Sequence, residues 1–396
     1  MTPNLLDPQF YADIDAMHAA LRQLRVDGPV WKDRANDLVA VLGHEEIIAV
    51  EKRADLFSSD GGYRSVVQPP GLERDMIALD DPDHAAQRSL VSRMFTPRAV
   101  RRLIPFIESN IAELIAAVRD RGEMDVVDDL AAPLSSRLAA HIIGFGPDDA
   151  PSVRSWSERL MRIDRVPHEP AVMAEFMAAI MEFSQVIGPI ADARREAPAD
   201  DLVSVWATAE LNGCPVGPET LVQETGLFIS GGAETTRTVI ARGLAELAGH
   251  PEDWEAMGAD PDLIPGAVEE MVRWVTPLNN FFRTALAPAS VGGHDVDAGQ
   301  RLILLYPSAN RDERVFKDPY TFDIRRSPNP HVAFGFGTHF CLGSSLARLQ
   351  LRLLLGQLTR QLKSLEVVEL PDIEPNIFAG AVRSFRLGFE PRGATP

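Results

Sequence analysis

The chain has 396 residues, of which 45% are apolar, so it can bury a large hydrophobic core. Its formal net charge of −18 disfavours nucleic acid as a partner, because binding phosphates requires a basic surface. Its two cysteines, Cys214 and Cys341, cannot form a disulfide framework, and they favour a reducing, cytoplasmic setting.

The N-terminal residues 1–17 have neither the basic nor the apolar region of a secretory signal. No run approaches the roughly 18 apolar residues that a transmembrane helix needs. We therefore expect a soluble, cytoplasmic protein with no membrane partner.

Helical spacing of apolar residues extends over residues 98–121 and 171–196. Strand signals are fewer and shorter, at residues 38–41, 302–305 and 384–389. Residues 58–78 contain several glycines and prolines and read as a long loop, either a lid or a plain surface connection. No stretch is rich enough in Gly, Ser or Pro to divide the chain. We therefore expect a single, mainly α domain over residues 1–396, with small β-sheets.

The longest predicted helix begins near Thr220, which fits a capping box with Gln223, and ends before Gly249. Its length of about 30 residues, or roughly 45 Å, predicts that it crosses the whole molecule. Gly231 and Gly232 lie in its middle, and each costs about 1 kcal/mol relative to alanine. A buried helix that keeps both glycines needs a reason to do so.

The strongest local pattern surrounds Cys341, which follows a glycine-rich loop and precedes an amphipathic helix. Glycines let the backbone adopt positive φ and come close to a flat ligand. A helix N-terminus presents free N–H groups and favours a thiolate, which is an axial haem ligand that promotes O–O cleavage. The plainer alternative is a buried, inert cysteine.

The pattern FxxGxxxCxG, formed by Phe334, Gly337, Cys341 and Gly343, resembles the cysteine-ligand loop of cytochrome P450 enzymes. This resemblance implies the cytochrome P450 fold, with haem b buried between the long central helix and the cysteine loop. It implies that Cys341 ligates the iron and that Phe334, Cys341 and Gly343 contact the cofactor.

Glu270 and Arg273 are spaced as an ExxR pair on one helix face, like the ion pair that locks the fold in this family. We expect Arg326 to be the third member of that cluster, with a structural role. An exposed helical ion pair is the plainer reading of ExxR alone.

The centre of the long helix resembles the family's oxygen-binding groove, to which Gly232 would contribute. There Thr235 would hydrogen-bond bound dioxygen or a neighbouring water, and Glu234 would relay protons. Close helix packing at the glycines and a surface carboxylate at Glu234 are the alternatives.

The same resemblance predicts two further sets of residues. Donors to the haem propionates would be His84, Arg88, Arg283 and His339. The substrate pocket would involve Leu227, Ala233, Leu278, Asn279, Phe281 and Phe378. Because most of these are apolar, we expect a hydrophobic substrate such as a steroid, a terpenoid or another lipid.

The implied activity is that of a monooxygenase, which inserts one oxygen atom from O2 into its substrate. The chain has no flavin or iron–sulfur motif, so a separate ferredoxin and its reductase would supply electrons. Five arginines are candidates for docking an acidic ferredoxin: Arg98, Arg101, Arg102, Arg348 and Arg352. A haem-binding sensor or carrier without turnover, and a peroxide-using enzyme of the same fold, are the alternatives.

Overall fold

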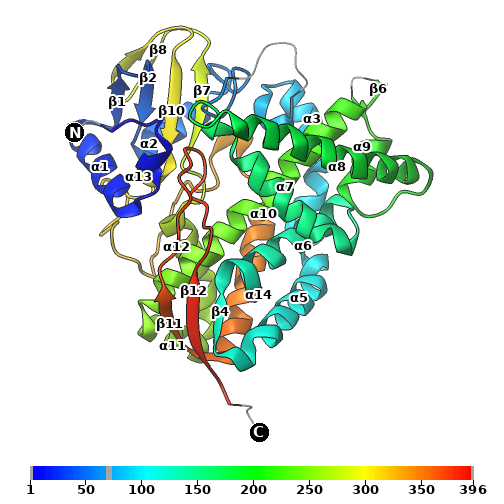
Figure 1. The fold of residues 1–396 in the computed structure, drawn as a ribbon. Helices are drawn as coiled ribbons and strands as arrows, with labels where there is room; N and C mark the ends of the chain where they lie inside the picture. Colours follow the sequence, from blue (N-terminus) through cyan, green and yellow to red (C-terminus); the bar gives the residue numbers. More distant parts are fainter. Residues whose placement is uncertain (1–2, 68–73, 212, 394–396) are drawn as a thin grey trace.

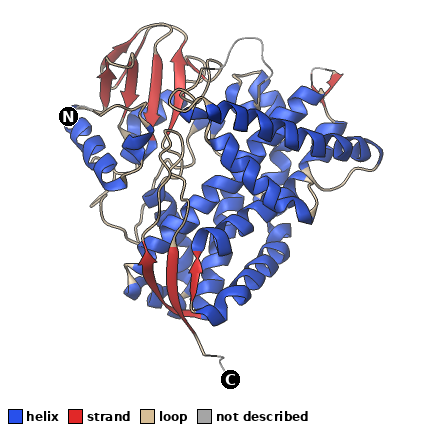
Figure 2. Cartoon of the chain, in the orientation of Figure 1, coloured by secondary structure: helices blue, strands red, loops and turns tan. Residues whose placement is uncertain are grey.

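The computed structural model describes residues 3–67, 74–211 and 213–393. Helices make up most of it, and short sheets lie at two edges (Figure 2), which confirms the prediction of a mainly α fold with small β-sheets. The α-helices are α1 (Ile14–Asp27), α2 (His44–Glu51), α3 (Asp83–Ser92), α4 (Pro97–Val100), α5 (Ile104–Val118), α6 (Ala132–Ile143), α7 (Ala150–Met161), α8 (Ala171–Glu196), α9 (Leu202–Thr208), α10 (Pro218–Ala248), α11 (Pro251–Ala259), α12 (Ile264–Val275), α13 (Tyr306–Ala309) and α14 (Ser344–Gln361).

The strands are β1 (Val30–Asp33), β2 (Leu38–Val41), β3 (Phe57–Ser58), β4 (Glu123–Asp125), β5 (Glu210–Leu211), β6 (Cys214–Pro215), β7 (Asn280–Ala285), β8 (Ala289–Val291), β9 (His294–Val296), β10 (Arg301–Leu305), β11 (Leu362–Glu369) and β12 (Arg386–Pro391).

Helix α10 crosses the middle of the molecule and packs against α6, α7 and α12 (Figure 1). Its 31 residues confirm the long helix that the sequence predicts. The predicted capping box is wrong, because the helix begins two residues before Thr220. Gly217 is the N-cap, and Pro218 occupies the first turn, where its missing N–H costs no hydrogen bond.

The segment predicted as one helix over residues 98–121 divides into α4 and α5, joined by a 3-10 turn over residues 101–103. Thr96 accepts a hydrogen bond from the N–H of Ala99 and so caps α4, while Pro105 lies in the first turn of α5. Both features are typical of helix starts. The predicted helix over residues 171–196 is confirmed as α8.

Helix α8 is long and apolar enough to cross a membrane by length and composition, which corrects the expectation that no such run exists. Its apolar stretch includes Glu182, whose carboxylate accepts hydrogen bonds from the side chains of Trp156 and Arg159 on α7. One such helix is weak support for a membrane span, since helices of globular proteins pass the same test.

The larger sheet has the strand order β1-β2-β10-β7-β3 and confirms the strands predicted at 38–41 and 302–305. Alternate residues of its central strands face opposite sides. Val39 and Leu302 pack toward α2, while Ala40 and Ile303 pack toward α1. Both faces are therefore buried, as the continuous apolar runs of β2 and β10 require.

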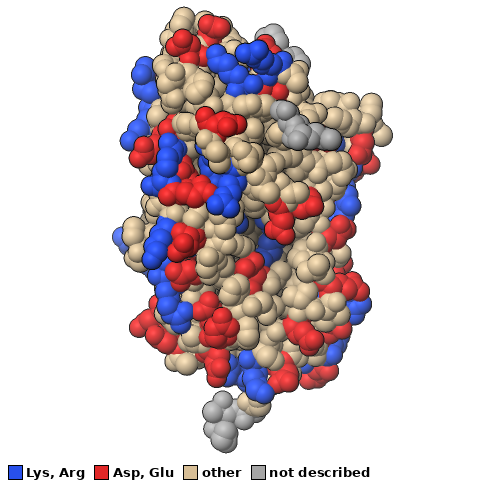
Figure 3. Space-filling view, turned by 90° about the vertical axis from the view of Figure 1, so that its left-hand side faces the viewer, with Lys and Arg blue, Asp and Glu red and all other residues tan. Residues whose placement is uncertain are grey.

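The second sheet, β11-β12-β4, lies at the C-terminal end of the chain (Figure 1). Strand β12 overlaps the predicted strand at 384–389 but is shifted toward the C-terminus. The molecular face in Figure 3 carries basic and acidic side chains interspersed, in spite of the net charge of −18.

Candidate functional site

Cys341 lies between the glycine-rich loop and the N-terminus of α14, as the sequence predicts. Its backbone N–H donates to the carbonyl of Phe334 over 2.8 Å. Gly335 and Gly337 have φ of 69° and 68°, a region that favours glycine. A Cβ at Gly337 would lie 2.4 Å from the carbonyl oxygen of Glu51, so the loop needs glycine there for close approach as well.

Opposing effects act on the pKa of the Cys341 thiol. Burial raises its pKa, whereas the N–H groups of Gly343 and Ser344 and the guanidinium groups of Arg88 and Arg348 lower it. The helix N-terminus thus acts in the predicted direction, but burial outweighs it in the protein alone. The other cysteine, Cys214, is exposed in the β5–β6 hairpin.

The ExxR cluster is confirmed by its contacts. Glu270 and Arg273 are fully buried, and two hydrogen bonds of 2.7 Å join them. Arg326 reaches both carboxylate oxygens of Glu270 over 3.2 Å, and Arg273 also donates to the carbonyl of Asn310 over 2.8 Å. Burial acts to raise the pKa of Glu270, but the two arginines hold it below its usual range. The cluster joins α12 to the segment that precedes the cysteine loop.

The cysteine loop contains one of the four predicted propionate donors, His339, and the other three lie near this loop. The rings of His84 and His339 lie 4.2 Å apart, and Arg88 donates to the carbonyl of Phe340 over 2.5 Å. Burial, followed by the charges of Arg283, His84 and Arg88, lowers the pKa of His339 to about 2.

The Nε2 atom of His84 is buried and has no hydrogen-bond partner within the described part of the chain. A buried nitrogen of this kind, with the Arg88 guanidinium nearby and that of Arg283 close to the neighbouring His339, suits an anionic ligand. These residues therefore fit a haem with its propionates.

The middle of α10 is open. Gly231 and Gly232 are exposed there, and a Cβ on Gly231 would meet no described protein atom within 4 Å. A Cβ on Gly232 would lie 3.6 Å from the Cβ of Ala139, which is ordinary contact, so close helix packing does not require either glycine. The Thr235 hydroxyl on this helix donates to the carbonyl of Gly231 over 2.8 Å.

Glu234 is not a surface carboxylate. It is buried and accepts two hydrogen bonds of 2.7 and 2.6 Å from Arg237, which also pairs with Glu158 of α7. Burial raises the pKa of Glu234, against the opposing charge of Arg237. Arg237 and Glu158 were not predicted from the sequence, although the spacing of Glu234 and Arg237 repeats that of the ExxR pair.

Only part of the predicted substrate pocket comes together. Phe281 and Phe378 have ring centroids 5.3 Å apart, and Leu278 packs with them. Tyr63 and Met161 were not predicted to line the pocket but pack against these residues, and we call the whole group the aromatic cluster. The ring of Tyr63 lies 5.9 Å from that of Phe281.

Two of the other three predicted pocket residues lie elsewhere, whereas the third, Asn279, adjoins the cluster and donates its backbone N–H to the carbonyl of Phe378 over 2.7 Å. Leu227 and Ala233 pack in the main helical core. Asn279 is buried, and its amide donates to the carbonyls of Asn376 and Ile377, so its side chain joins two chain segments.

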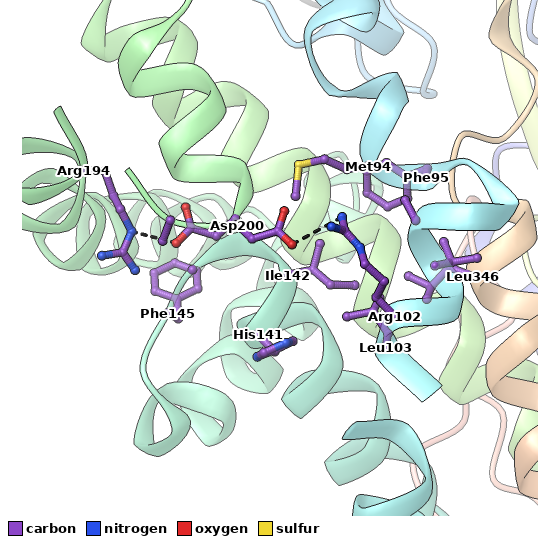
Figure 4. A pocket seen from close by; sticks show the side chains of 15 residues that line it. Met94, Phe95, Arg102, Leu103, His141, Ile142, Phe145, Arg194, Asp200 and Leu346 are labelled. Atoms are coloured by element: carbon purple, nitrogen blue, oxygen red, sulfur yellow. Dashed lines mark hydrogen bonds and ion pairs between the residues drawn. The ribbon is translucent and has the colours of Figure 1, made fainter. Parts of the chain in front are cut away.

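A separate cleft of about 460 Å³ lies between α4, α6 and the connection from α8 to α9 (Figure 4). Met94, Leu103 and Ile142 line its apolar part, and an ion pair of 3.3 Å joins Arg102 to Asp200 at its edge. Its described lining contains none of the residues predicted for haem or substrate binding, and Arg102 is the one predicted ferredoxin-docking residue in it.

Known proteins resemble this chain over nearly its whole length. The family model "Cytochrome P450" matches residues 259–383. A steroid C26-monooxygenase of Mycolicibacterium smegmatis is 38% identical over 390 residues, covering 98% of this chain and 96% of that protein. A methyl-branched lipid omega-hydroxylase of Mycobacterium tuberculosis is 33% identical over 377 residues, covering 91% of this chain and 88% of that protein.

Among solved structures, Mycobacterium marinum cytochrome P450 CYP268A2 in complex with pseudoionone has a TM-score of 0.90 and 33% identity. The match covers 96% of this chain and 97% of that one. This agreement in sequence and fold extends well beyond the cysteine loop and includes α10 and the ExxR cluster. The chain therefore belongs to the cytochrome P450 family, whose members are monooxygenases with a cysteine-ligated haem.

Proposed function

We propose that this enzyme oxidises an elongated, apolar small molecule of the steroid or branched-lipid class by inserting one atom of O2 into a C–H bond. The observation that carries the proposal is the placement of Cys341 at the start of α14, beside the predicted propionate donors, of which His84 and Arg283 are buried. The curated relatives named for steroid and branched-lipid oxidation support the substrate class.

When bound, haem supplies the iron centre at which O2 is activated. In our proposal the Cys341 thiolate ligates the iron. Its loop residues Phe334 and Gly343 and the helix residue Gly232 contact the cofactor. The propionates are held by His84, Arg88, Arg283 and His339. The aromatic cluster of Tyr63, Phe281 and Phe378 binds apolar substrate and excludes water from the site.

Proton supply would involve two residues on α10. The Thr235 hydroxyl can rotate from the Gly231 carbonyl into the open part of the helix and donate there. Glu234 can hold a proton because burial raises its pKa, and Arg237 fixes its carboxylate. Replacing Thr235 with alanine should leave O2 consumption but reduce the fraction of it that yields product. Unchanged coupling would contradict this role.

The two cysteines provide a matched test of the iron ligand. Cys341→Ser should abolish the thiolate-type absorption spectrum of the reduced, carbon monoxide-bound protein, whereas Cys214→Ser should keep it. A thiolate spectrum in Cys341→Ser, or haem held through another side chain in the wild type, would overturn the proposal.

The two alternative functions differ from this one in what they consume. Substrate-dependent O2 uptake with a surrogate ferredoxin and reductase distinguishes turnover from passive haem binding. Product formed with peroxide but not with O2 and electrons would favour the peroxide-using alternative. The substrate class can be tested by comparing the haem absorption shifts that steroids, branched fatty acids and terpenoids induce.

We infer that a separate ferredoxin docks beside the cysteine loop. Arg98 and Arg101 are exposed and form no ion pair within the described residues. Arg348 is less available, because two hydrogen bonds of 2.8 Å tie it to Glu269, while Arg352 lies 3.8 Å from the same carboxylate. Arg102 pairs with Asp200 across the cleft of Figure 4.

Reversing the charge of Arg98 and Arg101 to glutamate should slow reduction by an acidic ferredoxin and reduce its salt dependence. The substrate-induced absorption shift should not change. If electron transfer stays as fast as in the wild type, this docking surface is wrong.

A further inference from the structure

Glu51 is a buried carboxylate next to the cysteine loop that the assigned roles leave unused. It ends α2 and is 6% exposed. Its Oε1 atom accepts a hydrogen bond of 2.7 Å from the Tyr306 hydroxyl, and it lies 3.9 Å from Nη2 of Arg283. Glu51 therefore connects α13 and β7 to the end of α2.

The cysteine loop packs directly on this residue. A Cβ at Gly335 would lie 3.4 Å from Oε1 of Glu51, and a Cβ at Gly337 would collide with its backbone carbonyl. The N–H of Phe336, between the two glycines, acts to lower the pKa of the same carboxylate. Both features that favour glycine in this loop, positive φ and close approach, thus occur where the loop meets Glu51.

The Oε2 atom of Glu51 is buried and has no hydrogen-bond partner within the described residues. An unsatisfied buried polar atom destabilises the folded state. Glutamine could still accept the Tyr306 hydrogen bond, and it would not place a charge in an apolar environment. The acid at this position therefore needs an explanation based on its charge.

We propose that Glu51 is a positioning residue for the cofactor: it holds the Arg283 guanidinium toward the propionate-binding set, and its negative charge behind Arg283 lowers the reduction potential of the haem. This inference rests on the proposed function, because it requires a haem held by Arg283. A nearby negative charge in a low-dielectric environment favours the oxidised, more positive state of the cofactor.

The charged and titratable groups that act on the Glu51 carboxylate are Arg283 of β7 and Tyr306 of α13. His339 lies beyond Arg283, and the adjacent Lys52 places its ammonium group over the Phe336 ring. Burial raises the pKa of Glu51 to about 7, and Arg283 and Tyr306 oppose this rise. The carboxylate therefore gains its charge as the pH rises through neutrality, and the haem potential should fall over the same range.

The test measures the haem midpoint potential of the full-length holoprotein as a function of pH. Glu51→Gln keeps the shape of the side chain and an acceptor for Tyr306 but has no charge. We expect it to bind haem with the thiolate-type spectrum and to have a more positive potential than the wild type. The difference should be larger one pH unit above the Glu51 pKa of about 7 than one unit below it.

Tyr306→Phe is the matched control. It keeps the carboxylate but removes the O–H donor that lowers the Glu51 pKa, so the pH-dependent fall in potential should move to higher pH while its size is kept. A wild-type potential that does not change across neutral pH, or a fall that persists in Glu51→Gln, would overturn the inference. A wild type that binds no thiolate-ligated haem would instead overturn the proposed function.

Discussion

Two regions of the molecule bury carboxylates in opposite ways. In the ExxR cluster, Glu270 accepts hydrogen bonds from Arg273 and Arg326 and from the amide of Asn329. Near the aromatic cluster, Glu224 of α10 accepts only the N–H of Met76, over 2.6 Å, and its Oε2 atom has no partner within the described residues.

The second region contains another acid, Asp75, whose contact with the Tyr63 hydroxyl is a long one of 3.4 Å. Arg64 lies nearby, but its guanidinium pairs with Asp164, so neither Asp75 nor Glu224 has an ion-pair partner among the described residues. Burial raises the pKa of Asp75 to about 6 and that of Glu224 well above its usual range.

The difference shows that the two sides of the site are stabilised by different means. In the ExxR cluster, Glu270 stays ionised at ordinary pH values because the guanidinium groups of Arg273 and Arg326 compensate its negative charge. The stability of the region around the aromatic cluster depends on ring packing and on two carboxyl groups, Asp75 and Glu224, that stay protonated more readily than usual. We therefore expect mutations to affect the first region through charge balance and the second through packing and pH.

The largest effect should come from removing one charge of the ExxR cluster. Arg273→Leu leaves Glu270 buried with Arg326 as its remaining cation, and breaking a buried pair in this way typically costs about 3–5 kcal/mol. Urea unfolding of the holoprotein would measure this loss, and haem content should fall with it. The control is Arg325→Leu, which removes an arginine whose side chain is 52% exposed and pairs with Asp253. It should lower the free energy of unfolding by about 1 kcal/mol or less. Equal losses in the two variants would contradict the comparison.

A smaller loss should follow from Phe378→Ala in the aromatic cluster. Phe378 is 4% exposed, and its ring contacts Phe281 and the Arg64 guanidinium. Removing the ring should lower the free energy of unfolding by about 3 kcal/mol. This is the lower end of the range for a buried phenylalanine, because the cluster is small. The apolar substrate should also bind more weakly in an absorption titration, with the thiolate spectrum unchanged. Leu286→Ala, at a position 58% exposed, is the control and should have little effect on either measurement.

The sequence predicted the charged side of the site better than the apolar side, for a physical reason. Cys341 with its glycines, and Glu270 with Arg273, have fixed local spacings that the chemistry of the site requires. Tyr63 and Met161 join the pocket through apolar contacts between segments far apart in the chain, and such contacts leave no local pattern.

Two further features show where prediction from local sequence patterns fails. The start of α10 carried a usable signal, Gly217 followed by Pro218, yet the polar residues after it matched a capping box equally well. Glu51 had no signal, because its importance depends on Tyr306 and Arg283, which only the folded chain brings to it.

The smallest expected effect concerns the unpaired acid of the second region. In the folded protein the pKa of Glu224 is raised, so the fold keeps its proton while the unfolded chain releases it above its ordinary pKa of about 4.3. Stability should therefore fall as the pH rises above that value, and Glu224→Gln should remove most of this fall. We expect the variant to match the wild type near pH 4 and to exceed it by about 1 kcal/mol or more near pH 8, as measured by urea unfolding. Glu219→Gln, at an exposed position on the first turn of α10, is the matched control and should follow the wild type at both pH values. If Glu224→Gln is less stable than the wild type at the higher pH, the carboxylate has a cationic partner after all, and the contrast between the two regions does not hold.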